Sequence, residues 1–150
     1  MYRILLIPVL LILFASSSAH GAQGLIAVKS NHSVETTADN LVKALENSGM
    51  TVFTRINHAE GAADVDIELA PTEVVIFGNP KAGTPLMQCG RSVAIDLPQK
   101  ALIWEDDSGD VWLGYNDPEY LKYRHDLNGC DAALANIRQA LTNFAGIATD

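Results

Sequence analysis

The sequence predicts an α+β protein with one antiparallel or mixed sheet of about four to six strands and helices packed on one face. The first observation is the order of elements, a strand, a helix, four strands and a last helix, without regular strand–helix alternation. The second is a hairpin signal at residues 106–110. The third is that each long helix pattern carries one apolar stripe, which one sheet face can cover.

The first 21 residues are expected to be a cleaved signal peptide. A basic start at residues 1–3 precedes an apolar run at 4–15 and the small residues of Ser16–Ala19. The apolar run is shorter than the roughly 18 residues of a membrane-spanning helix, which favours cleavage over an uncleaved anchor. We therefore expect an exported protein, periplasmic or secreted, with a single domain at 22–150.

The charge balance disfavours two classes of partner. The chain has 10 Lys and Arg residues against 18 Asp and Glu residues, which gives a net charge of −8 at pH 7. Such an acidic chain repels phosphate backbones and anionic lipid surfaces. We expect no nucleic-acid partner, and no membrane association after signal cleavage.

The mature chain begins with a predicted strand and helix. Residues 24–30 (GLIAVKS) are rich in β-forming side chains. The helix follows a Ser33 cap, has Glu35 in its first turn, and carries apolar residues at helical spacing as far as Leu45. Gly49 is expected to end it.

A half-buried strand is predicted next, at residues 51–56 (TVFTRI). Its alternation places Val52, Thr54 and Ile56 on one side. The connection that follows, at 57–70, is polar and acidic, and we expect it to hold a short helical turn.

The most distinctive stretch is 71–98, which contains a buried strand at 73–78 (EVVIFG). A loop rich in Gly and Pro follows it, and then a short helix for which Thr84 is the expected cap and Pro85 the first residue. A short apolar segment follows at 93–95.

The last third of the chain completes the pattern. Two strands, at 101–105 and 111–115, flank the hairpin. Asp117 and Pro118 are typical of the start of a short helix. A final helix is expected from about residue 128 to Gly146.

Cys89 and Cys130 are the only cysteines. Export to an oxidising compartment allows a disulfide between them, which would tie the central helix to the last one. Two free buried thiols are the alternative, because the sequence does not give the distance between the two Cα atoms.

The loop at 79–85 is the candidate ligand site. A strand-to-helix junction presents unpaired backbone N–H groups, and Lys81 adds a positive charge suited to an anionic group. The spacing of a nucleotide-binding P-loop is absent, and a capped turn with Lys81 in solvent is the simpler alternative. The expected lining consists of Asn79, Lys81, Thr84, His58 and Asp117.

No complete metal site, nucleotide loop or nucleophilic triad is visible in the sequence. His32, His58 and His125 lack the spacing of strong metal motifs, so we expect no metal and no cofactor. Aromatic residues gather near the hairpin and the short helix, where they suit either a core or a protein interface. They are Trp104, Trp112, Tyr115, Tyr120 and Tyr123.

Five segments together resemble one family, the domain of unknown function 302 (DUF302). They are HSV at 32–34, INHAEGA at 56–62, PTEVVIFGNPKAGTPLMQ at 71–88, IDLPQKALIWED at 95–106 and YNDPEYL at 115–121. The resemblance covers nearly the whole mature chain. It implies a compact α+β domain with the element order given above, and a homodimer, but no established reaction.

Three functions stay open at this point. The leading one is a non-catalytic module that binds or senses a small polar ligand or an ion near Asn79. The second is a small hydrolase or isomerase in which His58 acts as the base and Lys81 stabilises an oxyanion. The third is a structural or assembly protein whose aromatic surface is a partner interface.

Overall fold

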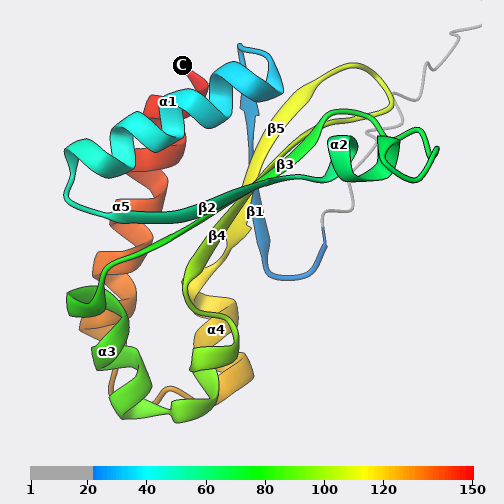
Figure 1. Cartoon of the computed structure of the whole chain (residues 1–150). Helices are drawn as coiled ribbons and strands as arrows, with labels where there is room; N and C mark the ends of the chain where they lie inside the picture. Colours follow the sequence, from blue (N-terminus) through cyan, green and yellow to red (C-terminus); the bar gives the residue numbers. More distant parts are fainter. Residues whose placement is uncertain (1–21) are drawn as a thin grey trace, which may run out of the picture.

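A five-stranded antiparallel sheet with the strand order β1-β5-β4-β3-β2 forms the centre of the computed structural model (Figure 1). The structure describes residues 22–150, so the signal peptide expected at 1–21 lies outside the described residues. Within 22–150, none of the helices combines the length and the apolar character needed to cross a membrane.

The predicted α+β class and the order of the main elements are confirmed, with short helices added between the strands. The elements are β1 (Leu25–Ser30), α1 (Val34–Asn47), β2 (Thr51–Asn57), α2 (His58–Ala63), β3 (Thr72–Gly78), α3 (Pro80–Cys89), the 3-10 helix η1 (Arg91–Ile95), β4 (Gln99–Glu105), β5 (Val111–Asn116), α4 (Pro118–His125) and α5 (Asp131–Thr149).

The long helices α1 and α5 cover one face of the sheet and form the core with it (Figure 1). Ser33 caps α1 by accepting a hydrogen bond from the Thr36 N–H, as expected, and Gly49 follows its end with a φ of +72°. Every second residue of the central strands points toward the helices. These core residues include Val75, Phe77, Ala101, Ile103, Leu113 and Tyr115, packed with Leu41, Leu45, Leu141 and Phe144.

The opposite face of the sheet carries apolar residues as well. The strand register places Trp104 of β4 opposite Trp112 of β5, and Leu102 between Val74 and Gly114. The Trp104 ring lies over Gly114, where an added Cβ would come within 2.9 Å of it. We call this surface the open face. Its apolar residues are Ala27, Gly114, Leu102, Val74 and Ile56 in one row, with Trp104, Trp112, Leu25 and Ile76 beside them, and Lys29, Thr54, Thr72 and Lys100 lie on the same side of the sheet.

The simple alternation predicted for residues 51–56 is wrong, because β2 contains a bulge. The register shifts between Val52, which pairs with Phe77, and Thr54, which pairs with Ile76. The extra residue, Phe53, opposes no partner in β3, so Val52 faces the helices while Thr54 and Ile56 belong to the open face.

The predicted start of the central helix, at Thr84 and Pro85, is also wrong. α3 begins five residues earlier, because Asn79 caps it and Pro80 takes the first position. The Asn79 side chain accepts from the Lys81 N–H at 2.9 Å and donates to the carbonyl of Gly49 at 3.2 Å. These two bonds fix the cap on both sides, and Pro85 lies inside the helix.

Two further boundaries differ from the prediction. The apolar segment at 93–95 is not extended but part of η1, where the N–H groups of Val93 and Asp96 bond to carbonyls three residues earlier. The last helix does not end at Gly146: it runs from Asp131 to Thr149, because residues after Gly146 still bury an apolar face against the core.

A disulfide joins Cys89 at the end of α3 to Cys130 at the start of α5, with 6.4 Å between the two Cα atoms. Of the two alternatives left open by the sequence, the structure contains the bridge. It closes a long loop, with 41 residues of sequence separation, and thereby lowers the conformational entropy of the unfolded chain.

Reduction of this disulfide is expected to lower the free energy of unfolding by about 2–4 kcal/mol. The measurement is thermal and urea unfolding of the mature protein with and without a reductant. A variant with both Cys89→Ser and Cys130→Ser should show the lower stability in both conditions. Equal stability of the wild-type protein with and without reductant would contradict a structural role for the bridge.

Candidate functional site

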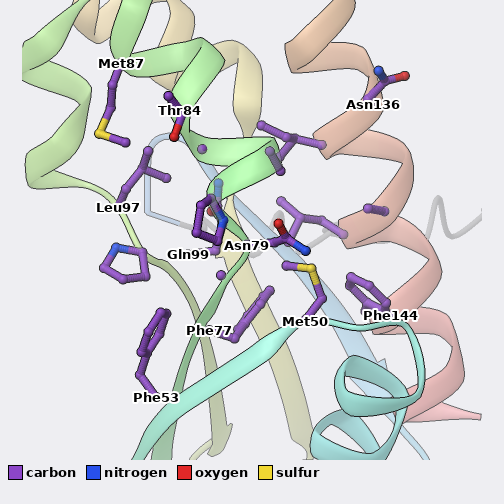
Figure 2. Close-up of a pocket in the computed structure, with 18 of the residues that line it drawn as sticks. Met50, Phe53, Phe77, Asn79, Thr84, Met87, Leu97, Gln99, Asn136 and Phe144 are labelled. Carbon is purple, nitrogen blue, oxygen red and sulfur yellow. The ribbon is translucent and has the colours of Figure 1, made fainter.

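A cavity of about 340 Å³ lies between α3, α5 and the adjacent end of the sheet. Figure 2 shows Thr84, Met87 and Leu97 on one side, Phe53, Phe77, Met50 and Phe144 on the other, and Asn79 and Gln99 between them. Only four of the lining residues have polar side chains, namely Asn79, Thr84, Gln99 and Asn136, and none is charged. The site is therefore a mainly apolar, uncharged cavity.

The local sequence of β2 and β3 explains one wall of the cavity. Phe77 is the last core-facing residue of β3, and its ring meets Phe144 of α5 edge-on, with ring centres 6.4 Å apart. The bulge in β2 redirects Phe53 to the same cavity, where it stays 56% exposed. Phe53 therefore forms the rim, while Phe77 and Phe144 form the inner wall.

The polar residues at the cavity differ in how their hydrogen-bonding groups are used. Asn79 is occupied as the cap of α3. Gln99, the first residue of β4, is only 7% exposed, and its Nε2 atom has no hydrogen-bond partner. Thr84 and Asn136 are exposed to solvent, so Gln99 is the buried polar side chain at the cavity whose donor has no partner.

The five residues predicted to line the ligand site do not come together. Asn79 and Thr84 line the cavity, whereas Lys81 lies on the exposed side of α3, outside the lining. Asp117 is at the same end of the sheet, but its side chain caps α4 by accepting from the Glu119 N–H. His58 is exposed at the start of α2, near the opposite end of β3.

His58 and Lys81, the base and the cation of the predicted enzyme, lie near opposite ends of β3. Asn57 pairs with Glu73 at one end of this strand, and Gly78, at the other end, leads into α3. Five residues of extended strand span about 17 Å, well beyond proton transfer through one water molecule. His58 and Lys81 therefore do not form one catalytic site.

A hydrogen-bonded network holds η1 against α4, below the cavity wall. The imidazole of His125 lies 3.0 Å from the Ser92 hydroxyl through Nδ1 and 2.5 Å from the Asp96 carboxylate through Nε2. Arg124 donates to the other carboxylate oxygen of Asp96 at 3.2 Å. Asp96 directly precedes three lining residues, Leu97, Pro98 and Gln99, so the network holds the chain where it enters the cavity wall.

The same three groups have the residue types of a Ser-His-Asp triad, in which a base activates a hydroxyl and a carboxylate orients the base. The imidazole of His125 is only 5% exposed, and neither it nor Ser92 or Asp96 lines the cavity. A substrate bound in the cavity would not contact Ser92. The geometry therefore supports a structural connection between η1 and α4.

The shifted pKa values belong to ion pairs and turns outside the cavity. A hydrogen bond to the buried Glu73 raises the pKa of Arg55 above its usual range, although partial burial acts in the opposite sense. The indole N–H of Trp112 and backbone N–H groups lower the pKa of Asp106 in the hairpin. Among residues 22–150, no cluster of three His, Cys, Asp or Glu side chains could hold a metal ion.

The most informative residues of the cavity escaped the sequence reasoning. Phe53 was expected opposite Val52 in a regular strand, and only the bulge brings it to the cavity. Gln99 lies before the strand predicted at 101–105, although a Gln next to an apolar strand is a signal that the sequence offers. The wall formed by α5 depends on tertiary packing, which the local sequence pattern does not encode.

Comparison with known proteins places the chain in a family. Residues 26–144 match the family described as "Domain of unknown function DUF302". The chain belongs to the DUF302 family. The crystal structure of an uncharacterised conserved DUF302 protein from Bacillus stearothermophilus has the same fold as this DUF302 domain, with a TM-score of 0.75 and 17% sequence identity, over 85% of this chain and 99% of the other.

The DUF302 domain also resembles part of some longer curated proteins. It is 50% identical over 104 residues to proteins named "Fluoride-specific ion channel FluC 1" from Brucella suis and Brucella abortus. The match covers 69% of this chain but only 41% and 38% of those relatives. The chain thus spans well under half the length of the relatives it matches.

Replacement of His125 and of Ser92 tests whether the hydrogen-bonded network is structural or catalytic. His125→Gln should lower the free energy of unfolding by about 1–3 kcal/mol, because Asp96 then loses a buried hydrogen-bonding partner. Ser92→Ala, at an exposed hydroxyl, should change it by less than about 0.5 kcal/mol. Urea unfolding measures both values, and p-nitrophenyl acetate hydrolysis is assayed in parallel. An esterase activity of the wild-type protein that Ser92→Ala abolishes would show that the network is catalytic.

Proposed function

We propose that this DUF302 domain is a non-catalytic binding module for a small, uncharged and mainly apolar molecule. One observation carries the proposal: a cavity of about 340 Å³ whose lining contains no charged side chain. Cavities of this size with apolar walls and a few polar groups are typical of small-molecule sites. The sequence had favoured a small polar ligand, whereas the character of the walls favours an apolar one.

The proposal retains the export expected from the sequence. An exported binding module that carries a disulfide is suited to an oxidising compartment outside the cytoplasm. A module of this kind needs no cofactor of its own, because the proposed activity is binding rather than a reaction.

The longer relatives suggest a setting for such a module. Because the match covers 38–41% of proteins named as fluoride channels, we propose that the matched segment is an accessory module joined to the rest of those proteins. Fluoride itself is a poor ligand for the cavity, since moving an anion into an apolar site without a cation is strongly unfavourable.

A variant that fills the cavity tests the binding proposal. Ala140 of α5 lines the cavity, and Ala140→Phe should weaken binding of the neutral fluorophore N-phenyl-1-naphthylamine at least about tenfold by steric overlap. Ala132→Phe places the same side chain on an exposed part of α5 and serves as the matched control. Fluorescence titration gives the dissociation constants, and sodium fluoride should not displace the probe. No saturable binding, or equal weakening by both variants, would refute the proposal.

We also propose that the domain forms a homodimer through the open face. The helices leave this face uncovered, and its Trp104, Leu102 and Val74 form a continuous apolar surface across the two neighbouring strands β3 and β4. Five strands about 4.8 Å apart and about 20 Å long give roughly 500 Å² of projected area. With the relief of the side chains, this approaches the roughly 800 Å² that each partner buries in a stable interface.

A second copy suits this surface because an apolar face is complementary to itself under two-fold symmetry. The aromatic residues that the sequence placed in one group lie in different places. Trp104 and Trp112 are on the open face, Tyr115 is in the core, and Tyr123 is 88% exposed on α4. Tyr120 lies in α4 with its side chain against Gly24, so the proposed interface uses the tryptophans and not the tyrosines.

The dimer proposal predicts that Leu102→Lys gives a monomer, because a lysine in the middle of the open face would lose its hydration on pairing. Light scattering coupled to gel filtration measures the mass of each variant, and circular dichroism verifies folding. Tyr123→Lys, an exposed change outside the open face, should leave the dimer intact. A monomeric wild-type protein, or a folded Leu102→Lys dimer, would exclude this interface.

A further inference from the structure

Gln99 is energetically unusual among the residues that line the cavity, because it has a buried donor without a partner. Within residues 22–150, its Nε2 is the one fully buried side-chain nitrogen or oxygen without a hydrogen-bond partner. A buried donor without a partner destabilises a protein by about as much as the hydrogen bond it lacks. A leucine of similar size would avoid that cost, so packing alone does not favour an amide here.

The position of Gln99 connects this free donor to the cavity. Gln99 pairs with Phe77 across β3 and β4, and both side chains point toward the helices. Both residues line the cavity. The terminal torsion of a glutamine is soft and roughly two-fold, so rotation of the amide about it turns Nε2 toward a bound molecule at little cost.

The other walls define what could accept this hydrogen bond. Three phenylalanines and two methionines line the cavity, and these side chains suit a flat or flexible apolar body. No lysine, arginine or histidine is present in the lining to balance a carboxylate or a phosphate. Lys81, Lys100 and Arg138 adjoin lining residues in the sequence, but none of the three belongs to the lining. The acceptor therefore has to be neutral.

We propose that the cavity takes an uncharged apolar molecule with a carbonyl-type oxygen, such as a ketone, an ester or an amide, and that Gln99 Nε2 donates a hydrogen bond to that oxygen. This inference rests on the proposed function of the cavity as a ligand site. It adds the chemical class of the ligand and makes Gln99 the residue that selects it.

The test compares two probes that differ in the carbonyl group. 2-Acetylnaphthalene and 2-ethylnaphthalene have similar shapes, and only the first offers a carbonyl oxygen. Wild-type protein should bind the ketone about tenfold more tightly, which corresponds to one hydrogen bond gained by a buried donor. Gln99→Leu should bind both probes within about twofold of each other, and should bind the hydrocarbon at least as tightly as the wild type does. Displacement of N-phenyl-1-naphthylamine gives all four dissociation constants.

The outcomes separate this inference from the function on which it rests. If neither probe binds the wild-type protein, both the inference and the binding proposal fail. If the two probes bind the wild type equally, the cavity is a ligand site but Gln99 selects no acceptor, and a water molecule is the simpler partner of Nε2. If the preference for the ketone persists in Gln99→Leu, another donor is responsible. Urea unfolding should show Gln99→Leu to be at least as stable as the wild type, because a buried donor without a partner has been removed.

Discussion

The cavity depends on how the segment from α3 to η1 is held, because this segment buries little apolar surface of its own. In α3 only Leu86 is buried, and in η1 only Val93. One buried side chain contributes about 1.5–3 kcal/mol, which does not compensate for the ordering of a segment of this length. Specific links supply the remainder, so the position of the cavity wall depends on them more than on the hydrophobic core.

Those links act at both ends of the segment and in its middle. Asn79 attaches the start of α3 to the carbonyl of Gly49 across the turn before β2. The disulfide of Cys89 attaches the end of α3 to α5, which forms the facing wall. Asp96 then joins η1 to His125 of α4. The bridge contributes to stability mainly by lowering the conformational entropy of the unfolded chain, whereas the hydrogen bonds stabilise the folded one directly.

The sequence was sufficient to predict the fold class and most of the helices and strands, because hydrophobic periodicity, caps and turn residues are local signals. Ser33 and Gly49 marked the ends of α1, and Asp117 the start of α4. It was not sufficient where two local signals competed. Asn79-Pro80 and Thr84-Pro85 are both good helix starts, and the bond from Asn79 to Gly49, 30 residues away, favours the first. The candidate site was assigned to a loop for the same reason: Asn79 and Thr84 do line the cavity, but α5 and the bulged Phe53 reach it only through tertiary packing.

The two surfaces proposed for binding and for assembly lie on opposite faces of one sheet. Phe77 and Gln99 point toward the helices and the cavity, while their neighbours Ile76 and Lys100 point toward the open face. This alternation follows from the period of two along a strand, so neighbouring residues of one strand serve different surfaces. A dimer through the open face would cover none of the cavity's core-facing lining from β3 and β4. The cavity and the open face meet at the bulge of β2. Phe53 forms the rim of the cavity, whereas Thr54 and Ile56 are residues of β2 on the open face. A molecule that contacts Phe53 would therefore contact the segment of β2 that also borders the proposed interface.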